Sequence, residues 1–144
     1  MIVKRWIIVL LYAVFIFVFT QSTASGASAM ISWLKAWFPM LPNEQAVEAV
    51  VYLRKLIHIG GYFLAFVLIH SAVRVTPRLN RCAYTVSAAL ALTLAACDEW
   101  YQTRLSHRSG SVLDIALDLA GIGLAAAAVR VFHIARKSEK ASSS

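Results

Sequence analysis

The sequence predicts an all-α membrane protein, a four-transmembrane-helix bundle with a short interfacial helix in its first outer loop. Apolar residues make up 60% of the 144-residue chain and charged residues only 15%, whereas a soluble domain carries about 25% charged residues. Four apolar stretches, residues 2–20, 56–75, 83–100 and 115–134, come close to the length of about 20 residues that a helix needs to cross a bilayer. Because lipid offers no hydrogen-bond partners to the backbone, each spanning stretch must be helical.

The first stretch, residues 1–20, is consistent with two kinds of segment. Lys4 and Arg5 precede its apolar run, and the small residues at positions 27–29 resemble a cleavage site, which together outline a signal peptide. The same features suit a signal-anchor that remains as the first transmembrane helix, and we expect the signal-anchor. In both cases the residues that follow reach the outer side of the membrane.

The distribution of charge predicts the orientation of the chain. If both termini are cytoplasmic, nine of the fourteen basic residues lie inside, namely Lys4, Arg5, Arg74, Arg78, Arg81, Arg130, Arg136, Lys137 and Lys140. Six of the seven acidic residues then lie at or near the outer side, since only Glu139 is inside. This bias follows the positive-inside rule, so the net charge of +7 needs no nucleic-acid partner. We expect a multi-pass membrane protein with both termini in the cytoplasm.

Residues 21–50 form the predicted outer loop. Trp33 and Trp37 recur there at helical spacing, and tryptophan favours the membrane interface, so a short helix is expected to lie on the outer leaflet. Pro39 ends this helix. Asn43 is then expected to cap a helix that continues into the second span.

Residues 51–136 hold the other three spans, and residues 137–144 form a polar cytoplasmic tail that is expected to be disordered. Small residues one helical turn apart, such as Gly61 with Ala65 and Gly121 with Ala125, predict places where helices approach closely. Cys82 and Cys97 are about 22 Å apart along one helix, too far for a disulfide. Neither their spacing nor any other predicts a metal ion or a cofactor, and the oligomeric state stays open.

Polar residues gather at the outer ends of spans two, three and four, where ionisable groups are costly and therefore candidates for function. The candidate ligand-binding residues are Lys55, His58, Tyr62, Asp98, Glu99, Gln102, Arg108, Asp114 and Asp118. Helical spacing puts those of each span on or near one face, and the predicted topology puts the three groups at one level. Arg108 and Lys55 are the expected counter-charges, and only the arginine can hold a carboxylate by two parallel hydrogen bonds.

Each of these residues also has a simpler structural interpretation. His58 could be a buried, hydrogen-bonded histidine, and Asp114 could be a helix cap or first-turn acid. Arg54 is interpreted as an arginine that reaches from the helix to the membrane interface. His70 and His133 are interpreted as boundary residues without chemistry. The convergence of so many polar groups on one side is the argument for a site.

Three strings, RKLIHIGGYFLAF, DEWYQ and RSGSVLDIALDLAGIG, resemble the VanZ-like family of bacterial membrane proteins. The resemblance runs from Arg54 to Gly123 and keeps the order and spacing of the polar residues. It implies functional roles for Lys55, His58, Asp98, Glu99, Gln102, Arg108 and Asp114. This chain has Asp118 where the family often has asparagine, which makes the expected pocket more acidic. It also lacks the Pro-Gly that commonly precedes the arginine.

The resemblance implies a role in the cell envelope, since the family takes its name from a protein linked to teicoplanin resistance. We expect an outer-leaflet site that binds the headgroup of a membrane lipid, a lipid-linked envelope precursor or a glycopeptide. One alternative is an enzyme that modifies such a lipid, with His58 or Glu99 as general base or with a divalent metal on His58, Asp98 and Asp114. Another is a structural protein whose polar cluster only fixes helix packing.

Overall fold

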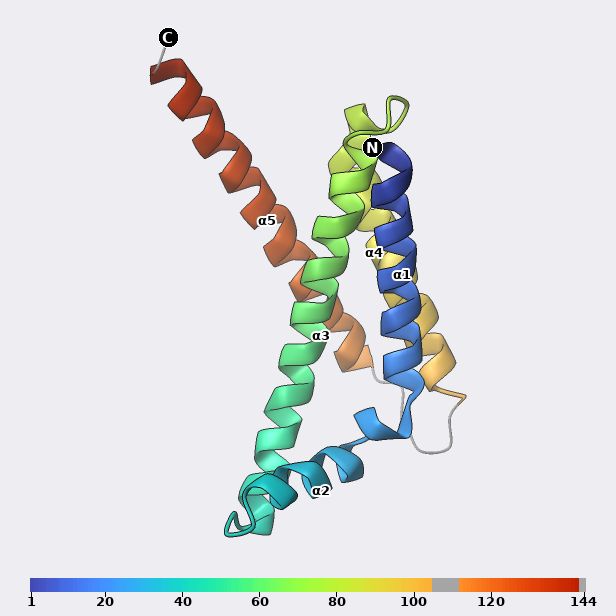
Figure 1. The fold of residues 1–144 in the computed structure, drawn as a ribbon, viewed down its shortest axis with the longest axis vertical. Helices are drawn as coiled ribbons and strands as arrows, with labels where there is room; N and C mark the ends of the chain where they lie inside the picture. Colours follow the sequence, from blue (N-terminus) through green and yellow to red (C-terminus); the bar gives the residue numbers. More distant parts are fainter. Residues whose placement is uncertain (105–111, 143–144) are drawn as a thin grey trace.

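Five α-helices account for most of the protein in the computed structural model, which describes residues 1–104 and 112–142 (Figure 1). They are α1 (Ile2–Gln21), α2 (Ala27–Trp37), α3 (Asn43–Val73), α4 (Ala83–Gln102) and α5 (Val112–Ser142). Two short 3₁₀ turns, Thr23–Ser25 and Asn80–Cys82, precede α2 and α4.

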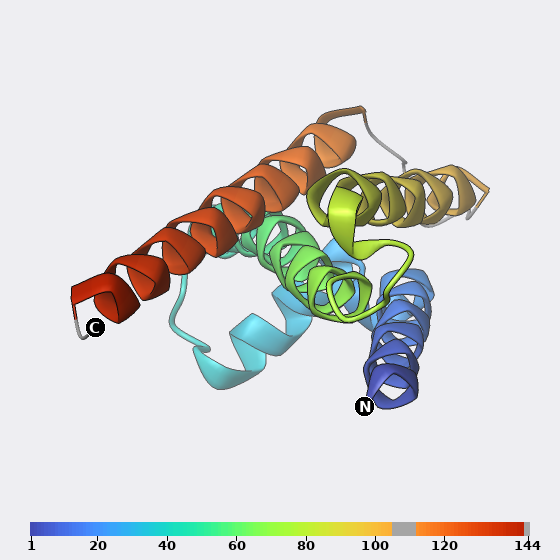
Figure 2. The ribbon, with the colours of Figure 1, turned by 90° about the horizontal axis from the view of Figure 1, so that it is seen from above.

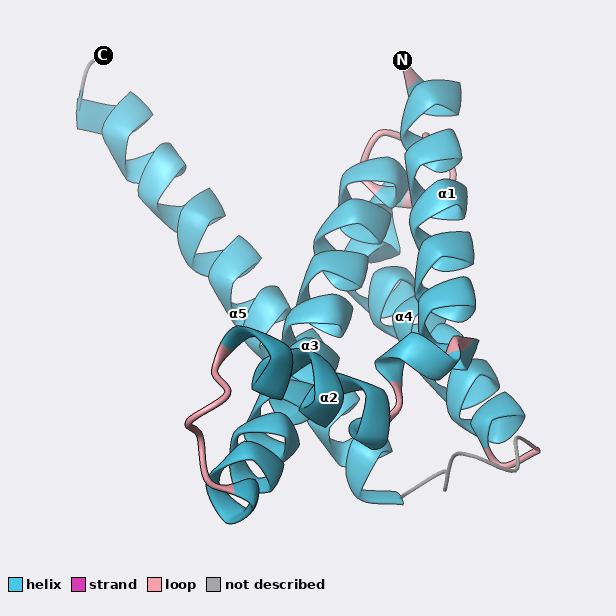
Figure 3. Ribbon diagram, turned by 60° about the horizontal axis from the view of Figure 1, so that its bottom comes forward, coloured by secondary structure: helices cyan, strands magenta, loops and turns pink. Residues whose placement is uncertain are grey.

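The four longer helices alternate in direction. α1 starts at the end of the bundle where both chain termini lie, which we call the termini end, and α2 lies across the opposite end, the α2 end (Figures 1 and 3). α3 returns to the termini end, α4 runs back, and α5 runs to the termini end again while sloping away from the bundle. α3 contacts the other four α-helices and lies at the centre of the view from above (Figure 2).

The core is built on one side of α3 from alanine, branched aliphatic and aromatic side chains. Its buried members are Tyr62, Ala65, Phe66, Ile69 and Val73 of α3, Ala83, Ala91 and Ala95 of α4, Ile122 and Ala125 of α5, and Ile16 of α1. Large apolar side chains also cover the outside, as at Leu10, Phe15 and Leu124. An outer surface of this kind needs lipid or protein to cover it.

Three helices are long and apolar enough to span a membrane, by length and composition: Ile2–Gln21, Asn43–Val73 and Leu113–Glu139. The chain therefore has the helices of a multi-pass membrane protein. α4 is not among the three, and its last turns carry Asp98, Glu99 and Gln102. The predicted second span, residues 56–75, corresponds to the second half of α3, a helix that is continuous from Asn43 and ends at Val73.

Two expectations about helix ends are wrong. Asn43 is the first residue of α3 rather than its cap, and its side chain accepts a hydrogen bond from Lys35 instead. The tail was expected to be disordered, but α5 continues through residues 137–142 to Ser142. Lysine, glutamate and alanine in this segment favour helix intrinsically, and no proline interrupts it.

Close helix approach is confirmed at one predicted glycine and not at the other. A Cβ atom on Gly121 of α5 would lie 2.3 Å from the carbonyl oxygen of Ile59 on α3, so only glycine permits this crossing. A Cβ atom on Gly61 would meet nothing within 4 Å. The carbonyl of Gly61 instead accepts a hydrogen bond of 2.9 Å from the Tyr12 hydroxyl of α1.

Candidate functional site

Polar side chains from four helices meet towards the α2 end of the bundle, where α1 and α4 end and α5 begins (Figure 1). We call them the polar cluster: Thr20 of α1, His58 and Tyr62 of α3, Asp98, Glu99 and Gln102 of α4, and Asp114 and Asp118 of α5. Six of these eight are buried, and Thr20 and Asp114 are partly exposed. Buried polar groups need partners, and the cluster supplies most of them internally.

His58 and Asp118 join α3 to α5. His58 Nδ1 lies 2.9 Å from Asp118 Oδ1, and the two residues are only 8% and 1% exposed. Gly121 follows Asp118 by one helical turn and lets the backbone of α5 touch α3 at Ile59. The short distance between the two helix backbones thus brings the imidazole and the carboxylate within hydrogen-bond reach.

Asp98 joins α4 to α1. The Gln102 side-chain amide donates a hydrogen bond of 2.9 Å to Asp98 Oδ2, and the Thr20 hydroxyl lies 2.5 Å from Asp98 Oδ1. The same hydroxyl is 2.9 Å from the Ile16 carbonyl. Since a hydroxyl has a single proton to donate, the carboxylate and the carbonyl compete for it.

Tyr62 lies between these two pairs. Asp98, Asp118 and Glu99 are all close enough to act on it electrostatically. Its hydroxyl is buried, and although Asp98 is close enough to interact with it, the contact is not a well-formed hydrogen bond. A buried hydroxyl that makes only a poor hydrogen bond is less stable than one with a good partner, so a ligand that reaches Tyr62 with an acceptor would gain binding energy.

The described part of the cluster is acidic. It contains four carboxyl groups, and Asp118, Asp114 and Glu99 all act electrostatically on His58. Lys55 was expected to be a counter-charge, but its ammonium lies 5.6 Å from the centroid of the Tyr52 ring, and no described ion pair joins it to these carboxylates. Arg108, the other expected counter-charge, lies outside the described residues.

A groove between α1 and α3 leads to the cluster; we call it the α1–α3 groove. It has a volume of about 390 Å³. Its apolar part is lined by Tyr12, Phe15, Ile16, Phe19, Ile57, Gly60, Gly61 and Leu64, and its polar part by Thr20, His58 and Tyr62. The groove therefore joins a wall suited to a hydrocarbon chain with groups suited to a headgroup.

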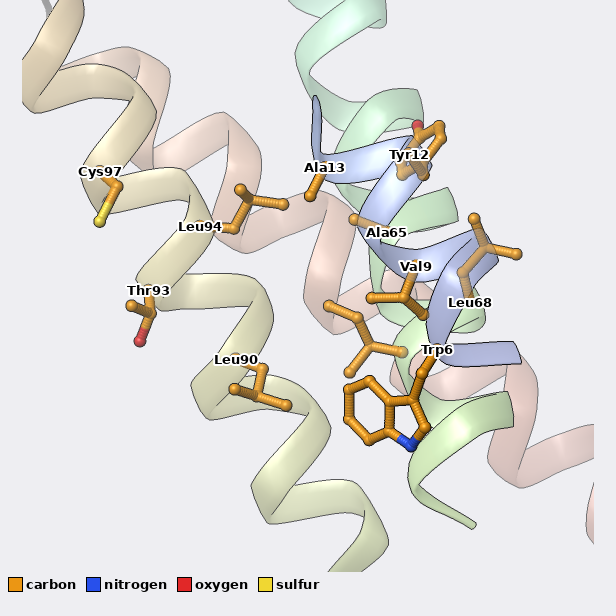
Figure 4. A pocket seen from close by; sticks show the side chains of 11 residues that line it. Trp6, Val9, Tyr12, Ala13, Ala65, Leu68, Leu90, Thr93, Leu94 and Cys97 are labelled. Carbon is orange, nitrogen blue, oxygen red and sulfur yellow. The ribbon is translucent and has the colours of Figure 1, made fainter. Parts of the chain in front are cut away.

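A second cavity lies on the other side of α1, between α1, α3 and α4 (Figure 4). Its volume is about 310 Å³. Side chains such as Trp6, Val9 and Leu94 line it, together with Thr93 and Cys97 (Figure 4). No charged residue is among its described lining residues, so it offers no charged group to a headgroup.

The described residues do not gather three histidine, cysteine or acidic side chains in a way that could hold a metal ion. The metal version of the enzyme alternative, with His58, Asp98 and Asp114, therefore has no support in this part of the chain. Asp98 instead meets Thr20 and Gln102, and His58 meets Asp118.

No family model, no curated protein and no solved structure matches this chain. The likeness to the VanZ-like family therefore rests on the three sequence strings alone.

Sequence reasoning missed two residues near the cluster. Thr20 is a direct partner of Asp98, and Arg54 lines a small cavity next to Thr20 and His58. Thr20 could have been found, because it is the polar residue that ends the first apolar stretch and so lies level with the outer ends of the other spans. Arg54 is one helical turn before His58, and its role is hidden by the ease with which long side chains reach water.

Proposed function

We propose that this chain is a VanZ-like protein of the bacterial cytoplasmic membrane that binds the headgroup of a lipid or lipid-linked envelope precursor at the polar cluster. The hydrocarbon chain of the ligand lies in the α1–α3 groove. The observation that supports this most is the composition of the groove, which is apolar along Phe15 and Leu64 and polar at His58 and Tyr62. A cavity with a few convergent polar groups at one end suits an amphiphile.

The chemistry of the cluster favours a headgroup with hydrogen-bond donors. Carboxylates only accept hydrogen bonds when ionised, so Asp98, Glu99 and Asp114 suit the hydroxyl or amine groups of a sugar-like or glycopeptide-type headgroup. A phosphate in the same ligand needs a cation, for which Arg54, Lys55 and Arg108 are the candidates in this segment of the sequence. A link to glycopeptide resistance would follow if the bound molecule is the antibiotic or its lipid-linked target.

One observation favours an enzyme as the second candidate. The Nδ1 atom of His58 is hydrogen-bonded to Asp118, which orients the imidazole and leaves its other nitrogen to act as a base. Such a base would activate water against a bound lipid. A change in the mass of the lipid, not just its retention, would identify this activity.

The binding proposal predicts that filling the groove expels the ligand. Gly60 lines the groove and has no atom within 4 Å of its Cβ position, so the Cβ atom of Gly60→Leu meets no backbone and the rest of the side chain extends into the groove space. The added side chain displaces several methylene groups of the ligand, each worth about 0.8 kcal/mol, so lipid retention should fall more than about tenfold. The measurement is native mass spectrometry of the detergent-purified protein after exposure to an envelope lipid extract.

The control for this experiment is Gly123→Leu, because Gly123 is also exposed on a helix, also has free space at its Cβ position, and does not line the groove. Its lipid retention should equal that of the wild type. Tyr62→Phe tests the headgroup end separately, since it removes only the hydroxyl. Its matched control is Tyr52→Phe, which removes a hydroxyl from an exposed position on the same helix. Equal retention by Gly60→Leu and the wild type would rule out the groove.

We further propose that α4 is the fourth span, so that both termini are cytoplasmic. Support comes from its 20 residues, which extend about 30 Å, and from the position of both termini at one end of the bundle (Figure 1). A chain in which α1, α3 and α5 alone cross would place its termini on opposite sides.

Cysteine labelling decides between these topologies. The native cysteines are free and exposed, so both are first replaced by alanine. A cysteine at position 138 (Ser138→Cys) should then react with a membrane-impermeant maleimide only after the cells are permeabilised. Ser32→Cys in α2 should react in intact spheroplasts. Labelling of position 138 from outside would show that α4 does not cross.

A further inference from the structure

A second polar cavity lies at the termini end of the bundle, far along α3 from the polar cluster. It has a volume of about 370 Å³. Its lining residues are His70 and Arg74 of α3 and the turn after it, Asn80, Arg81, Cys82, Ala83, Tyr84 and Thr85 around the start of α4, and His133 of α5. We call it the basic cavity, because two of these described residues are arginines and none is acidic.

The start of α4 adds to the positive potential of this cavity. α4 begins at Ala83, and its cap residue Cys82 makes no side-chain hydrogen bond to the helix. The first residues of the helix, through Thr85, line the cavity. The N-terminus of a helix carries a partial positive charge and directs backbone N–H groups outward, an arrangement that binds anions.

His70 is a buried side chain that lines the same cavity and interacts with the Ala83 backbone at the start of α4. The residue is 4% exposed, and its ring stacks on Phe66 with 8° between the planes and packs against Tyr84. The Ser87 hydroxyl donates a hydrogen bond of 2.5 Å to the Ala83 carbonyl, so its oxygen accepts the weaker one of 3.4 Å from His70 Nδ1. His70 Nε2 is buried with no hydrogen-bond partner within the described residues.

Arg74, His133 and Tyr84 form a chain along one wall. Arginine only donates hydrogen bonds, so His133 Nε2 accepts the one from the Arg74 guanidinium. The proton of the neutral imidazole is then on Nδ1, which donates across 3.2 Å to the Tyr84 hydroxyl. The hydrogen bond to His133 holds the Arg74 guanidinium beside the cavity, and the other N–H groups of the guanidinium can still donate to a ligand.

We propose that the basic cavity binds a phosphate group, as a lipid headgroup or as a free anion. A phosphate has several acceptor oxygens for Arg74, Arg81 and the start of α4, and arginine matches its geometry. It also suits His70 Nε2 in either form, because a protonated ring donates to a phosphate oxygen and a neutral ring accepts from a phosphate hydroxyl. His70 and His133, which the sequence presented as boundary residues, become parts of this site.

The test compares two lipids that differ only in the phosphate. Full-length protein in a phosphate-free detergent solution is titrated with phosphatidic acid or with the matching diacylglycerol, and native mass spectrometry counts the bound molecules. Inorganic phosphate is titrated separately by calorimetry. Wild-type protein should bind phosphatidic acid in preference to diacylglycerol, bind inorganic phosphate, or do both. Binding of phosphatidic acid without inorganic phosphate identifies a lipid headgroup as the ligand. Binding of inorganic phosphate, with or without the lipid, shows that a free anion is sufficient.

Three variants connect the binding to this cavity. Arg74→Gln, Arg81→Gln and His70→Phe should each weaken binding about tenfold, since a hydrogen bond to a charged group is worth that much. His70→Phe keeps the ring against Phe66, and Arg81 is exposed, so these variants remain informative if Arg74→Gln loses its fold. The matched control is Arg78→Gln, which removes an exposed charge from the same turn outside the cavity. Equal binding by all variants, or no binding of either phosphate probe by the wild type, would overturn the proposal.

Discussion

Replacing His58 with leucine should destabilise the folded protein by about 3–5 kcal/mol, the usual effect of removing one member of a buried charged pair. Asp118 is 1% exposed, and its neighbours Asp98 and Asp114 are also acidic. Without His58 the carboxyl must stay charged there or take up a proton. Aspartate in water is protonated only below about pH 4, so taking up a proton at pH 7 costs about 4 kcal/mol.

Removing the other member of the pair, as in Asp118→Leu, should lower the free energy of unfolding by less, about 1–3 kcal/mol. A histidine without its partner is largely neutral at pH 7, and removing Asp118 also removes its repulsion with Asp98 and Asp114. Reversible unfolding in detergent measures both free energies, and the double variant should lose less than the sum of the single ones. Equal losses for the two single variants would contradict this account of the pair.

Replacing Gly121 with alanine should destabilise the protein by about 1–3 kcal/mol, as overpacking does. The new Cβ atom would lie 2.3 Å from the Ile59 carbonyl oxygen, which belongs to the backbone and cannot rotate away. α5 would have to move from α3, and this would lengthen the hydrogen bond between His58 and Asp118. The loss should therefore exceed any gain from the higher helix propensity of alanine.

Gly123→Ala is the matched control, because it has the same chemistry two residues later on α5. Its Cβ atom would meet nothing within 4 Å, so the change should stabilise the protein by about 0.5–1 kcal/mol through helix propensity. Thermal unfolding in detergent should thus show shifts of opposite sign for the two variants. Shifts of the same sign would mean that the helices do not cross closely at Gly121.

Helix content could be predicted from the sequence because long apolar stretches leave few alternatives. The continuous helix from Asn43 and the short helix that holds Trp33 were both expected, and both are found. The end of α5 was missed, since polarity was interpreted as disorder although these residues are good helix formers. Whether a glycine permits close approach was predicted correctly at Gly121 and wrongly at Gly61, because the same spacing occurs on faces that pack and on faces that do not.

The proximity of the polar residues could also be predicted, since alternating helices bring their ends to the same level. Individual partners could not. The sequence does not say that Asp118 would meet His58 or that Asp98 would meet Thr20, because partners depend on the rotation of each helix about its axis. The binding role of these residues stays a prediction.

α5 has a consequence for the lipids around the protein. Its candidate span, Leu113–Glu139, has 27 residues, but charged residues near both ends limit the apolar stretch to residues 115–134, roughly 30 Å long and close to the hydrocarbon thickness of a typical bilayer. α5 slopes away from the other helices towards the termini end (Figure 1). The half of α5 nearer the termini end exposes Val131, Phe132 and Ile134, so the protein occupies a larger cross-section in the leaflet at that end. The protein is therefore wider in one leaflet than in the other. A membrane that curves to give more area to the leaflet at the termini end would accommodate it with less packing stress than a flat membrane.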